Sequence, residues 1–119
     1  MVRDEIAAAR YQHLFKLFGA MVIPVFSAPE LLAQLRSERP DAIAYDLDIP
    51  DGDLHLIRRI RIRSRLEGGG TPALAMTSAP AANVHTKAIL AGFQAYVAAE
   101  PLALLLAVAQ VLGDRAELN

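Results

Sequence analysis

The chain has 119 residues, the length of one ordinary domain, and we expect residues 1–119 to form a single unit. Its 12 Lys and Arg against 13 Asp and Glu give a net charge of -1, which excludes the basic field typical of nucleic-acid-binding domains. The absence of cysteine excludes disulfides and thiolate metal sites, and no stretch approaches the roughly 20 apolar residues of a membrane span. We therefore expect a cytoplasmic protein with no nucleic-acid or membrane partner.

The first two predicted elements are a helix and an edge strand. Apolar residues at spacings of three, four and seven predict a helix over about residues 4–18, and Gly19 follows as its C-terminal signal. The apolar positions of this helix are Ile6, Tyr11, Leu14, Phe15 and Phe18. The segment Met21–Phe26 is rich in β-branched and aromatic residues, but Pro24 cannot donate a ladder hydrogen bond, so we predict an edge strand there.

A second helix and a short buried strand follow. Ser27 and Glu30 have the spacing of a capping box, and the helix that they open ends before Pro40. The apolar run AIAY then predicts a strand that leads into Asp46. The acids of the sequence DLDIPDG are thus placed at the end of a strand.

The rest of the chain alternates between helical and strand patterns. A helix from residue 54 to about residue 67 ends at the glycines 68–70, which we interpret as a flexible linker. The later elements are, in chain order, a strand at 72–77, a helix at 82–90, a strand at 94–98 and a last helix from Pro101 to about Gly113. Such alternation is typical of an α/β fold in which helices cover a parallel sheet.

Two residues that can carry chemistry, Asp46 and Thr77, each end a predicted strand. In parallel sheets, functional groups gather at the carboxyl ends of strands because the loops there open onto a crevice. A carboxylate in this place can attack phosphorus if a divalent cation offsets the charges, and a neighbouring hydroxyl can hold a phosphoryl oxygen. Asp and Thr are also ordinary cap and turn residues, so the pair alone leaves both interpretations open.

Three segments together resemble one known family. The stretch RPDAIAYDLDIPDGDLHLIRRIR resembles the phosphoacceptor strand and following helix of response-regulator receiver (CheY-like) domains. The stretch TPALAMTSA resembles the fourth strand of that family, and AILAGFQAYV resembles the segment that leads into its fifth strand. The matches occur in the family's order and extend from about Val2 to Leu112. The resemblance implies a flavodoxin-like, doubly wound parallel sheet.

The resemblance also implies functional roles. Asp46 would be the phosphoacceptor, supplied by a histidine kinase or phosphotransfer protein, and the module would act on a downstream protein target rather than as an enzyme. Mg²⁺ would be bound by Asp46, by the main-chain carbonyl of Asp48 and by an N-terminal acid, for which Asp4 has the best register. The side chain of Asp48 would be incidental. Thr77 would close on the phosphoryl group, and Tyr96 would rotate inward when Thr77 moves.

Three departures from the family pattern predict a weakened site. Receivers carry a Lys just before the Pro that opens the last helix, and this chain has Ala99 and Glu100 there. Arg3 stands where the first acid of the N-terminal pair belongs, and it could pair with Asp46 and lower the affinity for Mg²⁺. The loop that contains PDGDLHLI is one residue short. We therefore favour a degenerate receiver that acts mainly through protein–protein interaction.

Almost nothing precedes Val2, where receivers have a central first strand. We expect that strand to be missing from the sheet or exchanged with a second copy, and we expect a homodimer because an open slot exposes strand edges. The last helix supports this expectation, since PLALLLAVAQVLG contains no charged residue.

The basic residues and the histidines give weaker indications of function, and one rival hypothesis remains. The basic residues of the middle helix are interpreted as a solvated face, and they are Arg58, Arg59, Arg61, Arg63 and Arg65. The three histidines lack the spacing of a metal-ligand pair. The rival hypothesis is a small aspartate-dependent, phosphatase-like hydrolase, in which Asp46 is the nucleophile and Asp48 the general acid.

Overall fold

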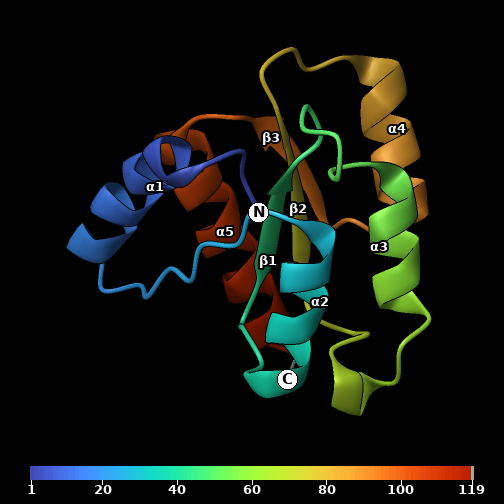
Figure 1. The fold of residues 1–119 in the computed structure, drawn as a ribbon. Helices are drawn as coiled ribbons and strands as arrows, with labels where there is room; N and C mark the ends of the chain where they lie inside the picture. The colour runs from blue at the N-terminus through green and yellow to red at the C-terminus, as the bar shows by residue number, and fades with distance from the viewer. Residues whose placement is uncertain (119) are drawn as a thin grey trace.

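A three-stranded parallel sheet lies between two layers of helices in the computed structural model, which describes residues 1–118, with side chains up to Asp114 (Figure 1). The sheet order is β1-β2-β3, with β1 (Ile43–Asp46), β2 (Ala73–Thr77) and β3 (Ala95–Ala98). The helices are α1 (Glu5–Leu17), α2 (Ala28–Ser37), α3 (Leu54–Arg61), α4 (Ala82–Ala91) and α5 (Pro101–Leu118), with a 3-10 turn η1 (Arg65–Glu67). This is the doubly wound α/β architecture predicted from the sequence.

The central strand β2 divides the core into two clusters. All five of its residues are buried, and successive side chains point to opposite faces. Ala73 and Ala75 pack with α2, α3 and α4, whereas Leu74 and Met76 pack with α1 and α5. Figure 1 shows α1 and α5 on one side of the sheet and α3 and α4 on the other. Helices therefore cover both faces of the sheet.

Local capping residues fix where the first helices begin. The Asp4 side chain accepts from the Ala7 N–H at 2.9 Å and caps α1. Ser27 Oγ accepts from the Glu30 N–H at 3.3 Å, which is the first bond of the predicted capping box. The return bond is shifted by one residue, since Glu30 Oε2 accepts from the Phe26 N–H at 3.4 Å and not from the N–H of Ser27. The predicted apolar face of α1 is only partly buried, since Tyr11 and Phe15 are buried as predicted, whereas Ile6 is 81% and Phe18 69% exposed.

The segment at 21–26 is not a strand, and that prediction was wrong. Its one bond of sheet type is the 3.2 Å hydrogen bond from the Val2 N–H to the Val25 carbonyl. A strand needs a partner along its length, and Pro24 supplies no N–H. On the side of β1 that faces away from β2, Met1 is the one described residue that bonds to the strand. Its N donates to Ala44 O at 2.5 Å, and its O accepts from the Asp46 N–H at 3.0 Å. The sheet therefore lacks the first strand, as expected, and the described residues show no exchanged strand in its place.

The glycines 68–70 do not form a flexible linker. Gly68 and Gly69 are buried, and Gly68 has a φ of 90°, which favours glycine. The predicted helix over 54–67 breaks after Arg61, because the chain turns there through η1. The prediction of a solvated basic face is confirmed for three residues, which are exposed: Arg58, Arg59 and Arg65. It is wrong for Arg61 and Arg63, which are partly buried.

The last helix is longer than predicted. It does not close near Gly113 but continues to Leu118, because a single glycine is tolerated within a helix. Among the residues that the structure describes, no helix is long and apolar enough to cross a membrane.

Candidate functional site

The candidate site lies where β1 and β2 end. Asp46 is the last residue of β1 and pairs with Met76, so Thr77, the last residue of β2, follows directly after its partner. Both residues stand at the carboxyl ends of adjacent parallel strands, as the sequence predicted. The structure therefore brings Asp46, Thr77 and the loop that contains Asp48 to one edge of the sheet.

The loop after β1 is held tightly around Asp46. Asp46 Oδ1 accepts from the Asp48 N–H at 2.7 Å, which is an Asx turn. A Cβ added to Gly52 would lie 1.8 Å from Asp46 O, so only glycine fits against this carbonyl. The Gly52 N–H donates to Ile49 O at 2.9 Å and closes the turn. Sequence reasoning missed this role of Gly52, although the PDG sequence signals a turn.

The side chain of Asp48 is not incidental. Its Oδ1 accepts from Thr77 Oγ1 at 2.8 Å, and its Oδ2 accepts from both the N–H and the hydroxyl of Ser78 at 2.7 Å. Sequence reasoning missed Ser78 completely, because no local signal links it to a residue 30 positions earlier.

These contacts set the protonation of Asp48. Burial acts to raise the pKa of its carboxyl, but the hydrogen bonds from Ser78 and Thr77 and the charge of Arg3 outweigh burial and hold that pKa below its usual value. Asp48 is therefore ionised at neutral pH. A general acid must carry a proton, so this geometry argues against the hydrolase hypothesis.

The amino group of Met1 also lies near Asp46. Burial lowers the pKa of this group to about 5, against the opposing effect of the Asp46 carboxylate. Because burial is the larger effect, this group does not supply a permanent positive charge beside Asp46.

The predicted Mg²⁺ ligands are only partly assembled. Among the described residues, no group of three His, Cys, Asp or Glu side chains could hold a metal ion. The carboxylate of Asp4 instead accepts from the Ala7 N–H at the start of α1. The Asp46 carboxylate and the main-chain oxygen of Asp48 are left as candidate donors. These two oxygens suit Mg²⁺, which keeps several waters in its coordination shell, but they form a weak set.

The residue expected to switch, Tyr96, faces α4. Its hydroxyl accepts from the Ala81 N–H at 3.1 Å, and its ring lies against His85 with centroids 5.1 Å apart. The Ala81 N–H is at the N-cap of α4, where no side chain caps the helix, so Tyr96 takes over that function. An inward rotation of Tyr96 stays a prediction.

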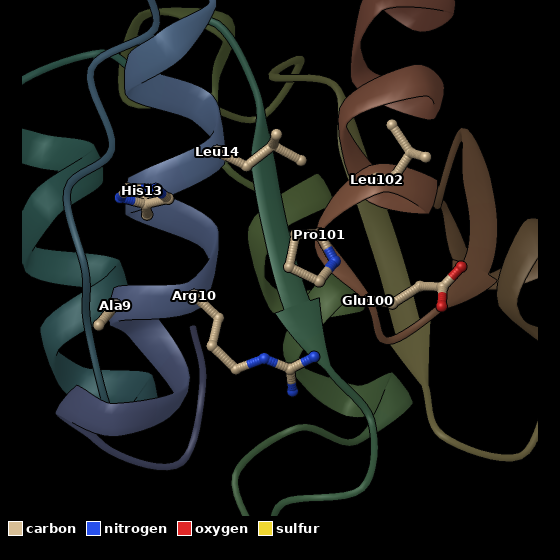
Figure 2. A pocket seen from close by; sticks show the side chains of 7 residues that line it. All are labelled: Ala9, Arg10, His13, Leu14, Glu100, Pro101 and Leu102. Carbon is tan, nitrogen blue, oxygen red and sulfur yellow. The ribbon is translucent and has the colours of Figure 1, made fainter.

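No cation stands where receivers have their Lys. The Ala99 N–H donates to Thr77 O at 2.8 Å, which ties this position to the site through the main chain only. Glu100 is exposed and is one of the residues that line a groove between α1 and the start of α5 (Figure 2). In that groove Arg10 extends from α1 toward the start of α5, and Leu14 and Leu102 supply apolar walls.

Comparisons with known proteins agree with this architecture. No protein-family model and no curated protein matches the chain. Its fold is similar to that of a proposed response regulator from Chloroflexus aurantiacus J-10-fl, with 26% identity and a TM-score of 0.82 over 95% of this chain and 93% of that one. A LuxR-family two-component response regulator from Aurantimonas sp. SI85-9A1 has 26% identity and a TM-score of 0.81 over 95% of this chain and 82% of that one.

The fold is also similar to that of a CheY-like response regulator receiver domain protein from Methanospirillum hungatei JF-1. It has 20% identity and a TM-score of 0.80 over 99% of this chain and 94% of that one. The chain therefore has the receiver (CheY-like) fold, and the resemblance predicted from three sequence segments is confirmed.

Proposed function

We propose that this chain is a receiver-like signalling module of a two-component phosphorelay, with Asp46 as its candidate phosphoacceptor. The observation that carries the proposal is the position of Asp46 and Thr77 at the ends of adjacent parallel strands in a receiver fold. The partners that fit are a histidine kinase or phosphotransfer protein on the donor side and a protein target on the output side.

In the proposed transfer, an Asp46 carboxylate oxygen attacks the phosphorus of a phosphohistidine. An O–P bond forms, the N–P bond breaks, and the imidazole leaves with its electron pair. Asp46 Oδ1 already accepts from the Asp48 N–H, so Oδ2 is the oxygen available for attack. Receiver domains generally bind Mg²⁺ in their acidic pocket, where it offsets phosphoryl charge. Here Asp46 and the main-chain oxygen of Asp48 would hold it.

The surroundings of Asp46 favour a degenerate receiver over a full phospho-switch. A phosphoryl group brings close to two negative charges, and the site offers it Ala99 and Glu100 instead of a Lys. Asp4 caps α1 instead of joining a metal cluster. Each of these differences lowers the stability of a phosphorylated state, so we infer that the module acts mainly by binding other proteins.

The interaction role includes a homodimer, for which the groove between α1 and α5 is the candidate surface. Arg10 and Glu100 line this groove with opposite charges, and no ion pair joins them within the described part of the chain. In a two-fold dimer, Arg10 of each copy would meet Glu100 of the other. Leu102 and Leu106 are 56% and 62% exposed on α5, and a second copy would cover them.

One experiment separates the switch from the degenerate module. The protein is incubated with Mg²⁺ and either acetyl phosphate or beryllofluoride, and the intact mass and the NMR signals of Tyr96 are recorded beside those of Asp46→Asn. A degenerate module shows no Asp46-dependent mass increase and no change at Tyr96 at millimolar Mg²⁺. An Asp46-dependent response would instead establish the phospho-switch.

A further inference from the structure

Three hydrogen-bond donors at the end of β2 converge on one carboxylate. They are Thr77 Oγ1, the Ser78 N–H and the Ser78 hydroxyl, and we call them the anion cradle. Thr77 Oγ1 also accepts from the Ala79 N–H at 3.2 Å, which leaves its own proton to point at Asp48. All three donors thus reach the Asp48 side chain at 2.7 to 2.8 Å, the short range of charge-assisted hydrogen bonds.

The cradle lies next to the candidate acceptor. The Asp48 N–H donates to Asp46 Oδ1 at 2.7 Å, so the occupant of the cradle and the acceptor belong to one turn. A phosphoryl group on Asp46 needs donors for its three oxygens, and the hydroxyl of Thr77 is the one that the proposed function assigns to it. Two anions cannot use the same donors at once, and like charges held in one turn repel each other.

We propose that the Asp48 carboxylate is a built-in ligand of the anion cradle and competes with a phosphoryl group on Asp46 for its donors. The inference rests on the proposed function for the identity of the competing anion. It makes Asp48 a positioning residue that holds Thr77 and Ser78 in an anion-bound arrangement without phosphorylation. Thr77 and Ser78 therefore keep the same arrangement with and without phosphorylation. A phosphoryl group on Asp46 must first displace the Asp48 carboxylate before it can reach their donors.

The first arm of the test does not depend on phosphoryl transfer. In an Asp46→Ala background, inorganic phosphate is titrated while the amide signal of Ser78 is followed by NMR. We expect no saturable shift when Asp48 is present, and binding at least about tenfold tighter when Asp48→Ala is added, since the competing charge-assisted bonds are removed. Asp48→Asn keeps the size of the side chain and should give the same direction of change.

Asp51→Ala is the matched control, because it removes a carboxylate from the same loop that bonds to the Ala28 N–H and not to the cradle. It should leave phosphate binding at Ser78 unchanged. Equal phosphate binding with and without Asp48, or a gain equal to that of Asp51→Ala, would overturn the inference.

The second arm uses beryllofluoride and Mg²⁺ with Asp46 intact. We expect the wild type not to respond at millimolar Mg²⁺ and Asp48→Ala to bind beryllofluoride at least about tenfold more tightly, because its main-chain oxygen is kept and its carboxylate is lost. Equal binding to both proteins refutes the competition while leaving Asp46 as an acceptor. Binding to neither, together with a positive phosphate arm, refutes the acceptor role and leaves the built-in ligand of the cradle supported.

Discussion

The carbonyl oxygen of Asp46 and the α-carbon of Gly52 touch so closely that a methyl group cannot come between them. A Cβ at Gly52 would lie 1.8 Å from that oxygen and 3.1 Å from a side-chain carbon of Ile49. Gly52→Ala should therefore lower the free energy of unfolding by about 1–3 kcal/mol, as overpacking does. Urea denaturation followed by circular dichroism measures this change.

Gly113→Ala supplies the matched control for the same chemical change. Gly113 lies within α5, and an added Cβ would meet no atom within 4 Å. This variant should be more stable than the wild type by about 0.5–1 kcal/mol, because alanine restricts the unfolded chain and favours the helix. A Gly52→Ala protein as stable as the wild type would show that the loop around Asp46 is looser than the structure indicates.

The phenol of Tyr45 gives the fold a dependence on alkaline pH. Tyr45 is 0% exposed and its hydroxyl donates to Asp53 O at 2.7 Å. Burial raises its pKa well above the usual 10.0, and a hydrogen bond with the main chain of Ile57 opposes burial only in part. Above pH 10 the unfolded chain loses a proton that the folded chain keeps, so the contribution of Tyr45 is complete below pH 10 and falls as pH rises further.

Urea midpoints measured from pH 8 to pH 12 test this prediction. The wild type should lose stability above pH 10 more steeply than Tyr45→Phe, and its tyrosinate absorbance should rise together with unfolding. At neutral pH the variant should be less stable by about 1 kcal/mol, because Asp53 O loses its donor. Equal slopes for both proteins above pH 10 would contradict the assignment to Tyr45.

At the scale of elements, Arg61 joins the end of α3 to the segments that lead into β2 and β3. Its Nε–H donates to Gly92 O at 2.9 Å, its Nη1 to Thr71 O at 2.6 Å and to Gly69 O at 3.1 Å, and its Nη2 to Gln94 Oε1 at 2.9 Å. Burial lowers the pKa of its guanidinium, against the effect of Tyr45. Arg61 thus satisfies three main-chain carbonyl oxygens and one side-chain amide oxygen in the segments that precede β2 and β3.

Arg61→Lys should cost about 2–4 kcal/mol of unfolding free energy, because an ammonium group cannot reach these four oxygens from one plane. The exposed Arg58 lies on the same helix, and Arg58→Lys should change stability by less than about 0.5 kcal/mol. Thermal melts of both variants make the comparison. Equal losses for the two would show that Arg61 contributes only surface charge.

The sequence predicted those elements whose signals are local. The capping box of Ser27 and Glu30 lies within four residues, and the helix that it opens was placed correctly. The ends of β1 and β2 follow from short apolar runs, and parallel pairing then places Asp46 beside Thr77. The fold and the position of Asp46 at the end of β1 were predictable for this reason, whereas its role as acceptor stays a prediction.

The features that were missed depend on contacts between distant residues. A segment such as 21–26 becomes a strand only if another segment pairs with it, and among the described residues Val2 alone makes a main-chain hydrogen bond to it. The glycines 68–70 carry no side-chain pattern that distinguishes a buried turn from a linker. Asp48 and Ser78 are 30 residues apart, so their contact appears only when the sheet is assembled.

At the scale of the whole molecule, the proposed dimer makes a prediction about charge. Arg10→Glu or Glu100→Arg alone would place like charges across the two-fold interface and should weaken the dimer about three- to tenfold. The double variant restores opposite charges and should restore the dimer. Sedimentation equilibrium of the four proteins measures the association. Identical association of all four, or a double variant as weak as the single ones, would exclude this surface as the interface.

The full burial of β2 has a consequence for how the molecule opens. Its amides lie between β1 and β3, with helices on both faces, so they should exchange with deuterium only when the whole chain unfolds. All four residues of β3 are only partly covered, and the N-cap of α4 is held by the single hydroxyl of Tyr96. Faster exchange should therefore begin at β3 and α4, where a rearrangement of Tyr96 leaves the central strand and the loop after Asp46 in place.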